Sequence, residues 1–155
     1  MTSLMSWRKK YSFLKPTYLD DVDRVLAGEV FQVQYLGYNK LNAHAEGTAR
    51  EILSRYSVQR RNKIANQKLI IDSRSIALHQ DSPDQASVLF NIPLSSVKNV
   101  IYRKRDKLYG NYCAFTVRDD AERCEGVHVM SCDSPDEISR IIQSFQTVFN
   151  IGSEQ

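Results

Sequence analysis

The sequence predicts an α+β domain in which seven antiparallel strands form a sandwich or partly open barrel, with one helix after the first strand and a C-terminal helix that caps it. Three observations lead to this prediction. Short segments of strand-forming residues, bounded by turn residues, follow one another from residue 31. Their connections are too short for the crossovers that parallel strands need. A strongly amphipathic stretch from Ser134 to Phe149 supplies the closing helix.

The first strand and the helix after it come from neighbouring patterns. Phe31, Val33 and Tyr35 alternate with glutamines, which predicts a half-buried strand that ends at Gly37. A capping box, Thr48 with Glu51, then predicts the start of a helix. The helix is expected to present one apolar stripe, formed by Ala49, Ile52, Leu53 and Tyr56.

Six further strands are predicted between this helix and the C-terminal one. Turn-rich pieces, such as residues 81–84 and 109–111, separate them. The predicted strands cover residues 68–72, 75–80, 87–92, 98–103, 111–118 and 126–132.

The C-terminal helix has a sharply defined start. Ser134 is the expected N-cap, Pro135 suits the first helical position, and Glu137 completes a capping box. Steps of three and four residues then build an apolar stripe of Ile138, Ile141, Ile142, Phe145, Val148 and Phe149. Phe149 is expected to lie in the core.

The domain is expected to span residues 29–150, between an irregular basic leader at residues 1–28 and a tail at residues 151–155. At 155 residues the chain is long enough to bury a core without disulfides or metal. No linker or internal repeat divides it, so one domain is predicted.

Composition and charge narrow the range of functions. The formal net charge of +3, from 21 basic and 18 acidic residues, is too small to indicate a nucleic-acid partner. No apolar run reaches membrane-spanning length, and residues 1–11 lack the apolar core of a signal peptide, so a cytoplasmic protein is expected. Cys113, Cys124 and Cys132 lack CxxC spacing, which predicts reduced thiols rather than a disulfide framework or a zinc site.

The sequence shows no constellation of catalytic residues. His44, His79 and His128 are scattered along the chain. His128 and Cys132 share a strand face, but at about 3.3 Å per residue they are too far apart to act as an imidazole and thiolate pair. The GxSxG, HExxH and phosphate-binding glycine-loop motifs do not occur. We therefore expect a non-enzymatic protein without a metal or other cofactor.

Four segments carry motifs of a known domain family. Val33–Gly37 is similar to its V-x-Y-[LM]-G at the end of the first strand, and Ile141–Phe145 to its helical I-G-Q-A-F. Ser12–Thr17 is similar to the leader S-F-x-x-K-P-T, one residue shorter, and Tyr112–Asp119 to the sixth strand Y-V-A-Y-V-A-K-D. Together they resemble the phosphotyrosine-binding (PTB) domain of signalling adaptors, closest in pattern to the Shc type. The resemblance implies a pleckstrin-homology-like fold.

The resemblance also implies a peptide-binding site. PTB domains bind Asn-Pro-x-Tyr segments of receptor tails by β-augmentation, in which the peptide pairs with the fifth strand beside the C-terminal helix. In this sequence the matching residues are Asn99, Val100, Ile101, Tyr102 and Arg103 on the strand and Ile138, Ile141 and Phe145 on the helix. Phe145 is expected to be shared between core and peptide.

Arginines are the expected ligands of a tyrosine phosphate, because their forked donors match its charge and its acceptor oxygens. Arg118 and Arg123 lie where the Shc type has basic phosphate ligands. An early phosphate-contacting arginine of that type falls near Glu46 here, and Arg50 is the candidate to replace it. Ile142 stands in place of the helix glycine, a change that narrows the expected groove.

Two other readings remain open. The absence of the early arginine favours phosphorylation-independent binding of Asn-Pro-x-Tyr segments in endocytic sorting or polarity. A pleckstrin-like module would bind phosphoinositide head groups, for which Arg60, Arg61 and Lys63 are the candidates. All these partners would bring a cytoplasmic protein to the inner face of the plasma membrane.

Overall fold

Seven antiparallel strands and two long helices form the fold, in the order that the sequence predicts. The computed structural model describes residues 23, 26–41, 45–58, 67–80, 87–119, 121 and 123–154. The helices are α3 (Ala45–Val58) and α4 (Pro135–Glu154), and a short 3-10 helix η2 (Leu94–Ser96) lies between the fourth and fifth strands. The strands are β1 (Glu29–Lys40), β2 (Gln67–Ile71), β3 (Ser75–Gln80), β4 (Ser87–Pro93), β5 (Val97–Asp106), β6 (Gly110–Asp119) and β7 (Cys124–Cys132).

The sheet has the strand order β4-β3-β2-β1-β7-β6-β5 and is not closed into a barrel. β1 belongs to both halves of the sandwich, because its residues 29–33 pair with β2 and its residues 34–40 pair with β7. β4 and β5 are therefore the two ends of the sheet.

A bulge allows β1 to turn from one half of the sheet to the other. The register with β7 shifts between Tyr35 and Gly37, and Gly37 has a φ of +150°, which side-chain-bearing residues rarely adopt. The prediction that the strand ends at Gly37 is wrong, since pairing continues to Lys40. Glycine marks the bend here and not the end of the strand.

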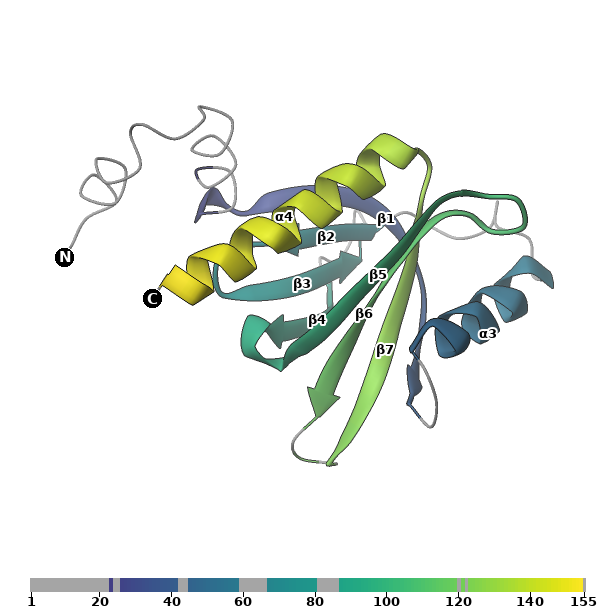
Figure 1. Cartoon of the computed structure of the whole chain (residues 1–155), viewed down its shortest axis with the longest axis horizontal. Coiled ribbons are helices and arrows are strands. Elements are labelled where there is room, and N and C mark those ends of the chain that lie inside the picture. The colour runs from purple at the N-terminus through teal and green to yellow at the C-terminus, as the bar shows by residue number, and fades with distance from the viewer. Residues whose placement is uncertain are drawn as a thin grey trace.

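Figure 1 shows α4 and α3 lying against different parts of the sheet. Two apolar clusters hold these layers together. The larger one fills the sandwich between the two halves of the sheet and beneath α4, and it includes Phe31, Leu69, Ile76, Phe115 and Phe145. The smaller one joins α3 to the outer face of β1, β6 and β7, and it includes Leu36, Ile52, Leu53, Tyr112 and Val129. Because β6 is covered on both faces, its residues 112–117 are buried without alternation.

The predicted stripe of α3 is confirmed, but its predicted start is wrong. Ala49, Ile52 and Leu53 are buried against the sheet. The helix begins at Ala45, so Thr48 lies inside it and is itself buried, 3% exposed. A Ser/Thr-x-x-Glu pattern inside a helix has the same spacing as a capping box, and sequence alone does not separate the two.

The predicted start of α4 is confirmed. The Ser134 hydroxyl accepts a hydrogen bond from the Glu137 backbone N–H at 3.2 Å. One flank of the helix is tied to β1, where Glu29 accepts hydrogen bonds from Arg140 and from the Ser144 hydroxyl. The helix continues to Glu154, through most of the expected tail.

The three cysteines are free thiols on β6 and β7. Cys113 and Cys132 are buried in the sandwich core, and burial raises the pKa of both, that of Cys132 to about 12. Cys124, the first residue of β7, is partly exposed. Most of the leader (1–28) and the basic cluster Arg60, Arg61 and Lys63 lie outside the described residues.

Candidate functional site

The β5 strand offers a sheet edge beside α4. It pairs with β6 on one side, and none of the described strands pairs with its other side. α4 lies against β5 as well as against β6 (Figure 1). A strand edge of this kind leaves backbone N–H and C=O groups available to an added strand.

The predicted peptide-binding residues of β5 divide between its two faces. Val100 packs against the sandwich core, whereas Ile101 packs against the α3 cluster. Arg103 also faces α3, where it forms an ion pair with Glu46. Tyr102, 43% exposed, shares a face with Val100 because side chains alternate along a strand. Val100 and Tyr102 therefore point toward the α4 side.

The predicted helix residues lie deeper than expected. Ile138 and Ile141 are fully buried, and Phe145 is only 2% exposed. The Phe145 ring packs against Phe115 of β6, with ring centroids 5.9 Å apart. These three side chains form the core under α4 and offer little surface to a ligand.

A neighbouring flank of α4 offers a ligand the surface that these three buried side chains do not. Phe149 is 39% exposed and its ring stacks on that of Phe145 at 6.1 Å, so the prediction that Phe149 is a core residue is wrong. Ile142, which is half-buried, lies on the same flank at a spacing of seven residues, or two turns. Because Ser144 holds the opposite flank against β1, this flank faces β5.

We give the name β5–α4 groove to the surface between these side chains, with Val100 and Tyr102 on its β5 side and Ile142 and Phe149 on its α4 side. A hollow of about 480 Å³ runs along the β5 edge itself, where its lining consists of Val100–Lys104 from both faces of the strand. Phe149 belongs to the apolar stripe that the sequence predicts for this helix. The stripe does not show which of its edges the sheet leaves exposed.

Arg118 and Arg123 lie together at the start of β5. Val97, the first residue of β5, pairs with Val117, so Arg118 follows directly at the end of β6. Arg123 is exposed in the turn before β7, where its φ of +54° is left-handed. The structure therefore brings these two predicted residues to one end of the groove.

A pocket of about 590 Å³ adjoins this end, and Arg118 lines it. Ser96, the residue before β5, and Lys40, at the end of β1, also line it. Its apolar wall includes Tyr38, Phe90 and His128. Asp119 lines the pocket as well, so its charged lining combines the Arg118 and Lys40 cations with one carboxylate, beside an aromatic wall that can pack against an aromatic ring. No sequence pattern indicates Lys40, because it comes from β1, which is far from Arg118 in the chain.

His128 lies inside an aromatic cage at this pocket. Its ring stacks on Phe115 at 5.1 Å and contacts the rings of Tyr38 and Phe90 at 4.7 and 4.6 Å. Its Nδ1 is hydrogen-bonded to the Tyr35 hydroxyl at 2.8 Å. Burial lowers the pKa of His128 to about 4 and raises the pKa of Tyr35. Both groups are therefore neutral at pH 7.

Arg50 lies at the other end of β5. Its guanidinium is 3.4 Å from the carboxylate of Asp106, the last residue of that strand. Asp106 pairs with Gly110, eight residues before Arg118 on β6, which corresponds to about 26 Å of strand. The three predicted phosphate ligands therefore do not form one site.

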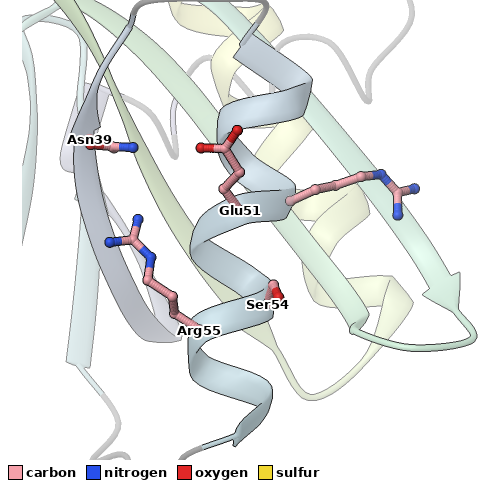
Figure 2. Close-up of a pocket in the computed structure, with 5 residues that line it drawn as sticks. Asn39, Glu51, Ser54 and Arg55 are labelled. Carbon is pink, nitrogen blue, oxygen red and sulfur yellow. The ribbon is translucent and has the colours of Figure 1, made fainter.

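A further hollow, of about 490 Å³, lies between α3 and β1 (Figure 2). Glu51 and Arg55 project from α3 toward Asn39 of β1. Ser54 and Arg50 complete the lining, so both signs of charge are present. The hollow belongs to the α3 face of the sheet and is separate from the β5–α4 groove.

Comparison with known proteins identifies the fold as the pleckstrin-homology-like fold of PTB domains. The chain is similar to the solution structure of the C-terminal phosphotyrosine interaction domain of APBB2 from mouse. The two share 15% sequence identity with a TM-score of 0.59, over 78% of this chain and 85% of that one. A likeness at this identity shows the fold alone. No protein-family profile and no curated protein sequence matches the chain.

The described part of the chain offers neither a cluster of metal-binding side chains nor a helix that could cross a membrane. Among the described residues, no group of three or more His, Cys, Asp or Glu side chains is placed to hold a metal ion. None of the helices in the described part of the chain has the length and apolar character needed to cross a bilayer.

Proposed function

We propose that this protein is a non-enzymatic adaptor domain that binds Asn-Pro-x-Tyr segments of receptor tails at the inner face of the plasma membrane. The observation that carries the proposal is the β5 edge, which no described strand covers and which lies beside an apolar flank of α4. A ligand that adds to this edge gains backbone hydrogen bonds from β5 and side-chain contacts from Tyr102 and Phe149.

The direction in which the ligand runs along β5 supports a phosphotyrosine at the end of the groove beside Arg118 and Arg123. Antiparallel pairing is the commoner arrangement of neighbouring strands. A ligand antiparallel to β5 runs from Asp106 toward Val97, so its C-terminal end arrives beside Arg118. Tyrosine is the last residue of Asn-Pro-x-Tyr. The tyrosine ring then enters the aromatic pocket, and its phosphate lies near Arg118 and Lys40 of the lining, with Arg123 in the adjoining turn before β7.

Strand addition predicts an alternating response to backbone methylation of the peptide. In a strand that lies at one edge, every second N–H points to the partner strand. Methylation of those amides is expected to weaken binding by roughly 3- to 10-fold each, because one hydrogen bond is lost. Methylation of the intervening amides is expected to have little effect.

Calorimetric titration of the singly methylated peptides against the unmethylated one measures this pattern. If the losses of affinity do not alternate from one methylated amide to the next, the result argues against β-augmentation. If the pattern alternates but phosphorylation has no effect on affinity, the groove is retained and the phosphate contact is rejected.

Phosphate recognition predicts a loss of selectivity when the arginines are removed. The phosphorylated peptide is expected to bind roughly tenfold tighter than its unphosphorylated twin, since charge-assisted hydrogen bonds to two arginines form only with phosphate. In the double variant Arg118→Ala/Arg123→Ala, both peptides should bind with equal affinity.

The matched control is Arg55→Ala/Arg74→Ala, which removes the same charge from exposed positions away from the pocket. This variant should keep the selectivity of the unmodified protein. An equal loss in both double variants would mean that net charge, and not the pocket, produces the preference.

A further inference from the structure

The turn between β5 and β6 is a projecting tip that carries positive charge and one exposed apolar side chain. The last residues that β6 shares with β7 are Asn111 and Cys132, so residues 104–110 extend past the end of β7. Figure 1 shows this turn at the far end of the molecule from the C-terminus. At its apex, Leu108 is 70% exposed.

Positive charge at this tip exceeds what its ion pairs neutralise. Arg103 is paired with Glu46, and Asp106 is paired with Arg50, so these four charges offset one another. Lys104, Arg105 and Lys107 are exposed, and none of them forms an ion pair with another described residue. Asp133 lines a hollow with Gly110 and Asn111 at the base of the hairpin and offsets part of this charge.

Internal hydrogen bonds satisfy much of the polar backbone of the turn. The N–H groups of Leu108 and Tyr109 donate to the Asp106 carboxylate at 2.9 and 3.1 Å. The Arg105 N–H donates to the Asn111 side-chain oxygen at 2.9 Å. The tip therefore presents Leu108 and cations on a convex, internally bonded turn. The amides of Arg105, Leu108 and Tyr109 are thus already bonded within the turn and are not available to pair with a peptide.

We propose that this hairpin tip docks on the surface of a bilayer rich in anionic phospholipid, with Leu108 inserted at the headgroup level and Lys104, Arg105 and Lys107 against the negative surface. Exposed cations that surround an inserted apolar side chain combine the two forces that hold proteins at anionic membranes. The inference is argued from the hairpin and does not need the proposed peptide binding, although Lys104 also lines the hollow along β5.

With the hairpin docked on a bilayer, the molecule can also bind a peptide in the β5–α4 groove. In the proposed complex, a ligand antiparallel to β5 begins at Asp106, which is the end of the strand that carries the tip. A tail that emerges from the bilayer would enter the groove next to the docked turn.

Sedimentation with vesicles of phosphatidylcholine, with and without phosphatidylserine, tests the proposal. The full chain should bind the phosphatidylserine vesicles, and the triple variant Lys104→Ala/Arg105→Ala/Lys107→Ala should bind roughly 100-fold more weakly, at about fivefold per cation. Leu108→Ala should weaken binding by roughly tenfold, because it removes most of the inserted apolar surface.

Salt concentration separates the contribution of the cations to vesicle binding from that of Leu108. At about 1 M salt the Debye length falls to about 3 Å, and the difference between the unmodified protein and the triple variant should largely disappear. The effect of Leu108→Ala should remain. The matched control, Arg55→Ala/Lys68→Ala/Arg74→Ala, removes three cations from α3, β2 and the turn after β2 and should bind like the unmodified protein.

Four results would overturn the proposal. The first is equal binding to both kinds of vesicle, and the second is an equal loss in the hairpin and control variants. The third is a loss confined to Arg60→Ala/Arg61→Ala/Lys63→Ala, which would assign the membrane contact to that cluster. Capture of an acidic peptide by the hairpin, without vesicle binding, would identify a protein partner instead.

Discussion

Phe145→Ala is expected to lower the free energy of unfolding by about 3–5 kcal/mol, the range for removal of a fully buried phenylalanine. Phe145 is 2% exposed and packs against Phe115 under α4, so the variant leaves a cavity that the rigid sheet cannot fill. Urea denaturation followed by circular dichroism measures the loss.

Phe149→Ala provides the matched control within the same helix. Its ring stacks on Phe145 but is 39% exposed, so the expected loss of stability is about 1 kcal/mol or less. In a peptide titration, Phe149→Ala should remain folded and bind several-fold more weakly, since Phe149 lines the groove. Similar losses of stability in the two variants would show that both rings belong to the core.

Acidification is expected to destabilise the protein through His128. The folded-state pKa of about 4 lies below the usual value of 6.5, so the unfolded chain takes up the proton more readily. The stabilisation from His128 is therefore complete above pH 6.5 and is lost as the pH falls toward 4. At about 1.4 kcal/mol per pKa unit, the loss amounts to roughly 3 kcal/mol.

Urea denaturation at several pH values between 7 and 4 measures this slope. The variant His128→Phe keeps an aromatic ring in the cage and should lack this part of the pH dependence, although carboxylates will still contribute at the acid end. Parallel curves for the unmodified protein and His128→Phe would reject the prediction.

Most of the fold was predictable because it depends on local patterns. The alternation of Phe31, Val33 and Tyr35 and the cap at Ser134 are set by neighbours in the chain, and the structure has a strand and a helix start at these places. The errors arose where one local signal has two structural meanings. A glycine such as Gly37 can end a strand or form a bulge within it. The spacing of Thr48 and Glu51 occurs at the start of helices and also in their interior.

The site was less predictable because it depends on long-range placement. The sequence indicated an edge strand and a helix, and the structure gives β5 an edge beside α4. It did not indicate that Phe145 is enclosed while Phe149 is exposed, since both lie on the same stripe. The resemblance places Arg50 with Arg118, yet the length of β6 separates the two residues. Lys40 reaches the pocket only through the pairing of β1 with β7.

The placement of the thiols determines how the unmodified chain reacts with a maleimide dye. Cys113 and Cys132 are enclosed and hold their protons tightly, whereas Cys124 is partly open to reagent. Conjugation is thereby directed to Cys124, next in the chain to Arg123. A fluorophore at that position reports on the arginine end of the groove and requires no engineered cysteine.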